Sequence, residues 1–179
     1  MKIYKDIING DEMCCDLFSM TVEYEDAIIK IPSKLVPKNF DPFDSIFCDC
    51  MKKKDEVNKP LPLKEIERVL DVVYNSELKQ IKMKKKEFKA YIKNYFKKII
   101  TYLEKNGKKN RIEGFKKGVQ DFCNFINPIY NEIELYTGAN GVNKEGEIIG
   151  GICISYWEDE SASGPMFYFF KEGLKEETI

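Results

Sequence analysis

The 179-residue sequence contains no histidine, the side chain that most often serves as general base or metal ligand near neutral pH. Hydrolysis by a serine or cysteine nucleophile that histidine activates is therefore excluded. No phosphate-loop motif, no recognisable secretory leader and no apolar run near the roughly 18 residues of a membrane helix is present. The six cysteines follow no framework spacing, so we expect free thiols in a reducing cytoplasm and no membrane association.

The net charge is only −1, but the charges are unevenly distributed along the chain. Residues 82–117 contain 14 lysines and arginines and three acidic residues, which gives this segment a charge of +11. The remaining residues carry −12. The sequence therefore predicts one basic segment within an acidic body.

The order of strand-like and helical segments is typical of an α+β fold with a mostly antiparallel sheet. Strands are predicted at 2–8, 17–23, 27–31, 133–137, 147–157 and 166–170. The segment 65–74 could be a helix turn or a strand, and its Val-Leu-x-Val-Val core favours a strand. Apolar residues at helical spacing predict two helices within 84–127, and a short connection at Asn106-Gly107 makes them an antiparallel hairpin. Repeated prolines predict a long mobile loop over about 33–64. We expect a single domain over 1–179.

The stretch Leu135–Gly141, "LYTGANG", ends a predicted strand with two closely spaced glycines. It lacks the lysine and the following helix that a phosphate cradle needs. We therefore interpret it as a hairpin turn in which Gly138 and Gly141 adopt conformations that other residues resist.

Two sets of side chains have the chemistry to bind a metal ion. Cys14, Cys15, Cys48 and Cys50 supply four thiolates for zinc, but adjacent cysteines are poorly spaced for one ion, and ordinary thiols are the simpler interpretation. Carboxylates cluster at Asp11, Glu12, Asp16, Glu23, Glu25, Asp26, Glu158, Asp159 and Glu160. They are compatible with weak calcium binding, although no EF-hand loop is present. We expect no cofactor, with low-affinity calcium as the open alternative.

The lysines of the first predicted helix form a candidate docking face. They are Lys85, Lys86, Lys89, Lys93, Lys97 and Lys98. The interleaved aromatic residues Phe88, Tyr91, Tyr95 and Phe96 lie on the apolar stripe, so we expect them in the core rather than stacked on nucleic-acid bases. Three interpretations stay open: a solvated basic face, a docking face for an acidic protein or filament, and, least expected, a nucleic-acid surface.

Several segments, in the correct order, resemble the translationally controlled tumour protein family, also called the histamine-releasing factor family. "MKIYKD" and the later Asp11-Glu12-Met13 with Asp16 match its N-terminal pattern. "VLDVVYNSEL" and "KKEFKAYIKNYFKKI" resemble the strand that leads into its first long helix. "LYTG" and "YFFKEGLKEE" resemble its C-terminal segments. The resemblance spans nearly the whole chain.

The resemblance implies a small β-tent with a helical hairpin and a disordered loop, similar to a group of Rab-GTPase chaperones. It implies a cytoplasmic, non-enzymatic binding protein with calcium-binding and microtubule-associated roles in growth and survival. Members of the family are also proposed to promote nucleotide exchange on a small Ras-type GTPase. The resemblance assigns that surface to the glutamate matching Glu12 and to a second glutamate, which Ala139 replaces here.

Two departures from the family pattern bear on function. The family's Gly-Gly-Asn-x-Ser-x-Glu loop signature has no counterpart, and Ala139 removes one of two carboxylates from the exchange surface. Loss of a carboxylate at a desolvated interface costs about 2 kcal/mol or more in binding free energy. The favoured hypothesis is therefore a monomeric interaction protein whose basic hairpin binds tubulin or microtubules. The alternative is an exchange regulator or chaperone of a small Ras- or Rab-type GTPase.

Overall fold

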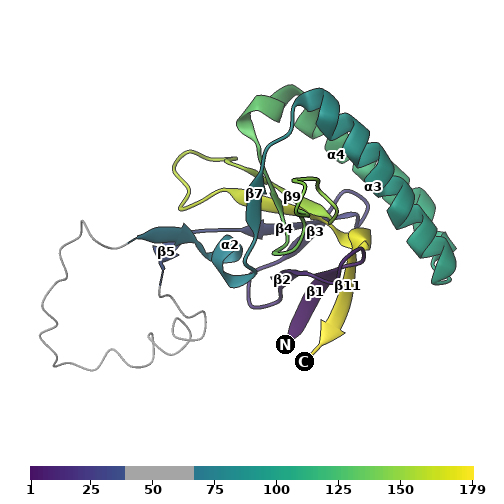
Figure 1. The fold of residues 1–179 in the computed structure, drawn as a ribbon, viewed down its shortest axis with the longest axis horizontal. Helices are drawn as coiled ribbons and strands as arrows, with labels where there is room; N and C mark the ends of the chain where they lie inside the picture. Colours follow the sequence, from purple (N-terminus) through teal and green to yellow (C-terminus); the bar gives the residue numbers. More distant parts are fainter. Residues whose placement is uncertain (39–66) are drawn as a thin grey trace, which may run out of the picture.

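The computed structural model describes residues 1–38 and 67–179. Within these residues the largest element is a six-stranded sheet with strand order β3-β4-β10-β9-β8-β7 (Figure 1). Its strands are β3 (Thr21–Glu23), β4 (Ile28–Pro32), β10 (Met166–Phe170), β9 (Ile152–Tyr156), β8 (Glu134–Thr137) and β7 (Lys79–Ile81). Every neighbouring pair is antiparallel, which confirms the predicted α+β class.

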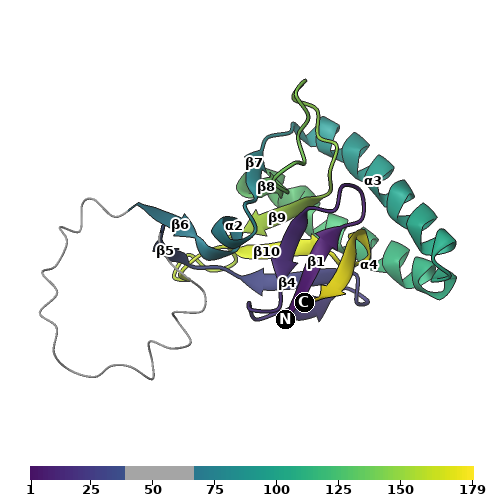
Figure 2. The ribbon, with the colours of Figure 1, turned by 60° about the horizontal axis from the view of Figure 1, so that its bottom comes forward.

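A second sheet, with strand order β11-β1-β2, brings the two ends of the chain together (Figure 2). Its strands are β1 (Lys2–Asp6), β2 (Glu12–Cys15) and β11 (Leu174–Thr178). The backbone amide of Ile179 donates to the carbonyl of Met1 at 2.9 Å. A separate short pair is formed by β5 (Leu35–Pro37) and β6 (Arg68–Leu70), and β6 leads directly into α2 (Asp71–Asn75).

Two helices lie side by side over one face of the six-stranded sheet (Figure 1). They are α3 (Lys85–Lys105) and α4 (Ile112–Ile126), joined by a short connection, as the predicted antiparallel hairpin requires. Phe88 and Tyr95 are buried, and Tyr91 and Phe96 pack partly buried against the same core. The expectation that these four aromatic residues belong to the core is confirmed. No helix among the described residues is long and apolar enough to cross a membrane.

Strand β10, with the sequence MFYFF, is central because it is buried on both faces. Tyr168 and Phe170 pack in the core beneath α3 and α4. Phe167 and Phe169 point to the opposite face and pack in a second core with Met13 of β2. Successive side chains of a strand alternate between its faces, so one aromatic strand contributes to both cores.

Three predicted elements differ from the structure. Of the predicted strand 17–23 only β3 is a strand, and β2, which precedes it, was not predicted. The predicted strand 65–74 is the short β6 followed by a helix, where the Asp71 carboxylate accepts the Val72 amide at 2.8 Å. Strand β5 falls inside the range 33–64 predicted as a mobile loop, because it pairs with β6. From residue 39 onward that range lies outside the described residues.

The glycines of "LYTGANG" serve close packing rather than an unusual backbone conformation. The positive φ angles found at glycine belong to other positions, namely Gly10, Gly107 and Gly146. A Cβ added to Gly141 would lie 1.9 Å from the Thr137 hydroxyl oxygen, which no real structure tolerates. The predicted turn is present, since the Gly141 amide donates to the Gly138 carbonyl at 3.0 Å, but the reason given for its glycines was wrong.

Candidate functional site: a joined turn surface and a basic helix

The turn between β1 and β2 is joined to the loop after β8 by the side chain of Asp11. Its carboxylate accepts the backbone amide and the side-chain amide of Asn140, each at 2.8 Å. The side-chain amide of Asn9 donates to the same carboxylate at 3.0 Å. Glu12 follows Asp11 at the start of β2 and Ala139 precedes Asn140, so this contact joins the two chain segments that carry the predicted positions. We call these five residues the turn surface.

Glu12 and Ala139 are both half-buried on the turn surface. Burial raises the pKa of the Glu12 carboxyl group, and the positive charge of Lys5 opposes this effect. Gly138, which precedes Ala139, has no space for a side chain, because an added Cβ would lie 2.6 Å from the Cβ of Asp11. With the Asp11 carboxylate occupied by Asn140, Glu12 is the remaining acidic side chain of the turn surface.

A buried carboxylate, Asp6, holds the base of the same turn against the six-stranded sheet. It accepts the Gly151 amide through Oδ2 at 2.6 Å and the Ile8 amide through Oδ1 at 3.0 Å. Burial raises the pKa of Asp6, although the two amide hydrogen bonds lower it in part. Tyr91 of α3 donates its hydroxyl proton to the Gly150 carbonyl, which ties the helix to the same loop. Asp6 was not predicted as a site residue, because its partner Gly151 is 145 positions away in sequence.

The six lysines of the predicted docking face are all exposed on α3, but they do not form one surface. Lys98 follows Lys97 and therefore points about 100° away around the helix. Its charge acts on Asp6 instead, on the side of α3 that faces the turn. Lys85 donates from Nζ to the Asn127 carbonyl at 2.9 Å and so links α3 to the end of α4.

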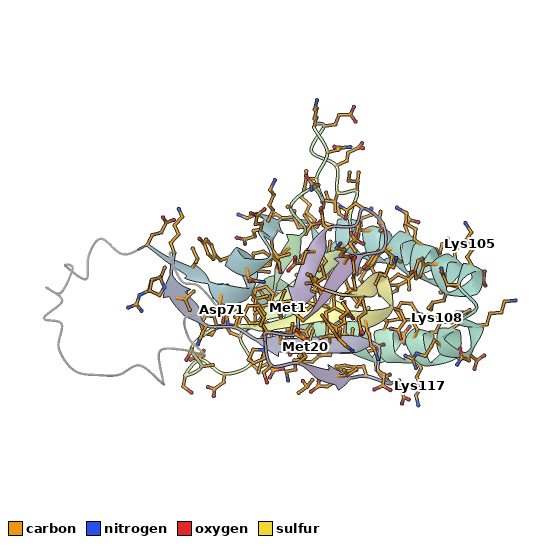
Figure 3. The ribbon with its side chains drawn as sticks, turned by 90° about the horizontal axis from the view of Figure 1, so that it is seen from below. Met1, Met20, Asp71, Lys105, Lys108 and Lys117 are labelled. Carbon is orange, nitrogen blue, oxygen red and sulfur yellow. The ribbon has the colours of Figure 1, made fainter. Side chains whose placement is uncertain are left out.

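The other four lysines, Lys86, Lys89, Lys93 and Lys97, recur at steps of three and four residues and share one side of α3. We call them the lysine row. None of them forms a salt bridge with any residue of the two described ranges, whereas five lysines elsewhere do, namely Lys2, Lys5, Lys30, Lys38 and Lys117. Lys117 of α4, for example, lies 3.4 Å from the Glu25 carboxylate. Further lysines, including Lys105 and Lys108, surround the connecting end of the hairpin (Figure 3). The lysine row thus presents positive charge without internal compensation.

A groove of about 390 Å³ runs between α3 and α4 beside the lysine row. Lys89 and Lys93 stand on its α3 wall, and Gln120 and Asn124 stand on its α4 wall. Its apolar lining consists of Phe88, Ile92, Phe96, Cys123, Ile126 and Tyr130. We call it the hairpin groove. The sequence predicted the helices and the lysines but not this groove, which arises only when the two helices pack together.

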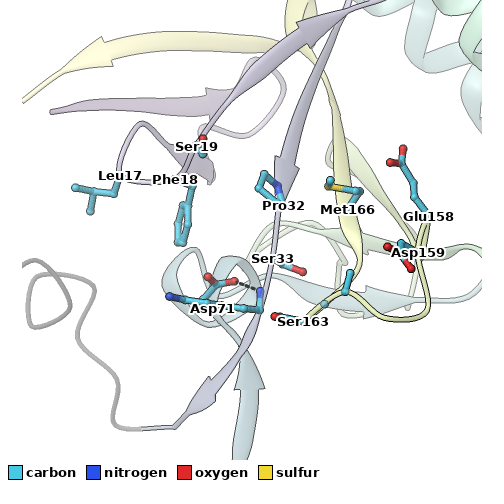
Figure 4. Close-up of a pocket in the computed structure, with 13 residues that line it drawn as sticks. Leu17, Phe18, Ser19, Pro32, Ser33, Asp71, Glu158, Asp159, Ser163 and Met166 are labelled. Carbon is cyan, nitrogen blue, oxygen red and sulfur yellow. Dashed lines mark hydrogen bonds between the residues drawn. The ribbon is translucent and has the colours of Figure 1, made fainter. Parts of the chain in front are cut away.

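A larger pocket of about 560 Å³ lies between the end of β4, α2 and the loop that follows β9 (Figure 4). Its apolar side includes Phe18, Pro32 and Met166, and its polar side includes Asp71 and Glu158. Asp71 accepts the backbone amide of Lys34 at 3.0 Å, shown as a dashed line in Figure 4. Sequence reasoning missed this pocket because its walls come from four separate segments.

The three carboxylates of this pocket already serve the fold, and that of Asp159 accepts the amide and the hydroxyl of Ser161. Asp71 is buried, and burial raises its pKa against the effect of the amide hydrogen bonds that it accepts. Glu158 lies 2.9 Å from the Lys30 ammonium group and accepts a hydrogen bond from Tyr168. These interactions hold the loop after β9 against the sheet. The pocket is therefore a feature of how the loop docks, with its acidic groups engaged by protein partners.

The family model described as translationally controlled tumour protein matches residues 1–175. The chain belongs to this family. Curated relatives carry the name translationally-controlled tumor protein homolog: one from Drosophila melanogaster is 30% identical and one from Theileria parva is 28% identical. Each comparison covers 99% of both chains.

Two solved structures share the fold of this translationally controlled tumour protein family member. The translationally controlled tumor-associated protein of Schizosaccharomyces pombe matches with a TM-score of 0.73 and 23% identity, covering all of both chains. The translationally-controlled tumor protein of Caenorhabditis elegans matches with a TM-score of 0.64 and 24% identity, covering 100% of this chain and 99% of the other. The resemblance found in the sequence is thereby confirmed in family and in fold.

The described residues of this family member do not form an assembled metal site. Within them, no group of three or more cysteine, aspartate or glutamate side chains is arranged to hold a metal ion. Cys14 is fully buried, and burial raises its pKa well above the usual range of a thiol. Cys48 and Cys50, the other half of the zinc hypothesis, lie outside the described residues. Weak calcium binding by the loop carboxylates stays a prediction.

Proposed function

We propose that the protein is a non-enzymatic binding protein whose lysine row docks on acidic protein surfaces, such as the acidic tails of tubulin in microtubules. The observation that carries this proposal is the lysine row itself: four exposed cations on one side of α3 form no salt bridge with the described residues. Membership of the translationally controlled tumour protein family supports a binding role.

The energetics favour a partner with several acidic groups. A single exposed ion pair contributes only about 0.2–1 kcal/mol, because both charges stay partly hydrated. Several lysines on one rigid helix face can each contribute such an ion pair, and the helix backbone loses no further conformational entropy when they bind. The positive face also raises the rate of encounter with an acidic partner. Binding should therefore require a run of carboxylates and should weaken as salt screens the charges.

Co-sedimentation with microtubules tests this proposal. We expect the protein to pellet with microtubules at low ionic strength and to be released as the salt concentration rises through the physiological range. Microtubules whose acidic tails have been removed by limited proteolysis provide the matched control and should retain much less protein. Equal pelleting with intact and trimmed microtubules, or no pelleting at the lowest salt, would contradict the proposal.

A second candidate function is regulation of a small Ras- or Rab-type GTPase through the turn surface. One observation supports it: the Asp11–Asn140 contact joins the turn before β2, the strand that Glu12 begins, to the loop that contains Ala139. Nucleotide release requires no acid–base chemistry, only a surface that binds the nucleotide-free GTPase more tightly than the loaded form. Glu12 alone supplies one available carboxylate there, so we expect this activity to be weak.

The variant Ala139→Glu tests the second candidate, because it adds a second carboxylate at the position beside Asn140. Release of a fluorescent GDP analogue is followed for several Ras and Rab proteins with the wild-type chain and with the variant. If the turn surface acts on a GTPase, the variant should accelerate release from at least one of them. Identical rates with wild type, variant and no added protein would remove this candidate and leave the lysine row unaffected.

A further inference from the structure

We infer that the hairpin groove receives an aromatic side chain from the acidic segment that binds the lysine row. This inference rests on the proposed function and adds the chemistry of the partner: an acidic peptide that carries one aromatic anchor. The groove and the lysine row share the same wall of α3, since Lys89 and Lys93 belong to both. A peptide held by these lysines therefore passes directly over the apolar lining.

The groove is closed at the end where α3 begins and α4 ends. Lys85 bridges this end through its hydrogen bond to the Asn127 carbonyl at 2.9 Å. The Tyr130 hydroxyl donates to the Met83 carbonyl at 2.6 Å and holds the tyrosine ring against the same end. These two hydrogen bonds thus fix the side chains at this end of the groove. Sites that are formed before the ligand arrives lose less entropy on binding.

The chemistry of the lining favours an aromatic occupant. The rings of Phe88 and Tyr130 lie 5.2 Å apart at the closed end, and Phe96 lines the groove further along. Aromatic rings prefer offset or edge-to-face neighbours, and a ring bound in the groove would gain such contacts in addition to the burial of its surface. The volume of about 390 Å³ lies within the usual range of ligand pockets.

Cys123 contributes to the apolar wall rather than a reactive group. Its thiol is half-buried, and burial raises its pKa to about 11. At neutral pH it is therefore a neutral thiol, which behaves as a small apolar side chain. The groove offers binding surface and no nucleophile.

The charge of the groove is one-sided, and this selects an acidic peptide. Lys89 and Lys93 on the α3 wall carry positive charge, whereas Gln120 and Asn124 on the α4 wall are neutral and hydrogen-bonded to each other at 3.2 Å. A bound segment should place its carboxylates along α3 and its anchor between the helices. Central, well-packed aromatic anchors supply most of the binding energy in many interfaces, and surrounding charges set orientation and rate.

The test uses fluorescence anisotropy with the full-length protein and two labelled peptides of identical length and acidic charge. One peptide has a central tryptophan, and the other has serine at that position. We expect the tryptophan peptide to bind at least tenfold more tightly, and we expect this ratio to persist as salt weakens both peptides. A saturated long-chain fatty acid is titrated as a third ligand.

Two substitutions by tryptophan locate the anchor. Asn124→Trp places a large side chain on the groove wall without changing charge, and Asn94→Trp makes the same change at an exposed position of α3 that does not line the groove. Both positions are exposed, so both variants should fold. We expect Asn124→Trp to bring the two peptides to nearly equal affinity and Asn94→Trp to preserve the tenfold preference.

Each outcome separates this inference from the proposed function. If both peptides bind wild type equally, the aromatic anchor is wrong while docking of acidic segments stands. If neither peptide binds at low salt, both proposals fail. If Asn124→Trp still prefers the tryptophan peptide, the aromatic anchor binds outside the groove. If the fatty acid binds and neither peptide does, the groove is a lipid site.

Discussion

The turn surface and the lysine row are both polar, but they use their polar groups in opposite ways. At the turn, Asp11 is occupied by Asn9 and Asn140, and Asp6 is occupied by two backbone amides. On α3, the lysine row makes no salt bridge inside the described part of the chain. Charges that the fold already uses are poorly available to a partner, whereas uncompensated charges remain available.

Because of this difference, substitutions in the two regions should affect the stability of the fold to different extents. Substitutions at the turn should change the free energy of unfolding, because they leave hydrogen-bond donors of the fold without their acceptors. Substitutions in the lysine row should leave that free energy nearly unchanged, because exposed side chains without partners contribute little to it.

The largest effect is expected for Asp6→Asn. Asp6 uses both carboxylate oxygens as acceptors, so an amide would place an NH₂ group against one of the two backbone amides. We expect a loss of about 2–3 kcal/mol in the free energy of unfolding, as measured by urea denaturation. Asp71→Asn is the matched control, since Asp71 accepts both of its amide hydrogen bonds through Oδ1, which asparagine retains. It should cost less than about 1 kcal/mol, and equal costs would contradict this explanation.

A smaller effect is expected for Asp11→Ala. The substitution removes the acceptor of the Asn140 amides at a partly exposed position, so water replaces part of what is lost. We expect a loss of about 1 kcal/mol in the free energy of unfolding. Asp16→Ala, at a nearby exposed carboxylate, should change it by less than about 0.5 kcal/mol. Amide hydrogen exchange at residues 138–141 should be faster in Asp11→Ala but not in Asp16→Ala, which would show that the lost stability comes from the contact between the two loops.

A pH titration of unfolding tests the buried state of Asp71. Burial raises its folded-state pKa above the ordinary value of 3.8, so between the two values the folded chain holds a proton that the unfolded chain has released. The contribution of Asp71 to stability is therefore greatest below about pH 3.8 and falls as pH rises through the folded-state pKa. The stability of wild type relative to Asp71→Asn should decline over that window and then level off. A difference that is flat or rises with pH would contradict the assignment.

The smallest effect on stability is expected for the triple variant Lys89→Glu, Lys93→Glu and Lys97→Glu. Its free energy of unfolding should stay within about 0.5 kcal/mol of wild type, because these lysines are exposed and form no salt bridge within the described residues. Thermal and urea denaturation measure this directly. A loss above about 1 kcal/mol would mean that the lysine row supports the fold.

The sequence predicted the parts of the fold that have strong periodicity. The hairpin of α3 and α4 follows from apolar residues at steps of three and four, and β10 follows from its aromatic run. Strand β11 was missed because its sequence LKEET is almost entirely exposed and charged, and it is a strand because β1 pairs with it. Strand β7 was missed because three residues give no periodicity, and β8 provides its pairing.

The candidate site was predictable only one element at a time. Residue types and helical spacing identified the lysines of α3, and the family resemblance identified Glu12 and Ala139. The contact of Asp11 with Asn140 joins residues 129 positions apart, and the hairpin groove requires two packed helices. Such features depend on tertiary packing, which a local pattern does not specify. Even within the predicted face, Lys98 is separated from the lysine row by the turn of the helix.

The central claim is that the lysine row is the docking surface, and it is tested most directly by the affinity for a labelled oligoglutamate peptide at low salt. The triple variant of Lys89, Lys93 and Lys97 is compared with a control of equal charge that reverses the exposed Lys144, Lys171 and Lys175 outside the hairpin. The account predicts at least a tenfold loss of affinity for the triple variant and less than threefold for the control. Equal losses for the two variants, or unchanged binding by the triple variant, would contradict it.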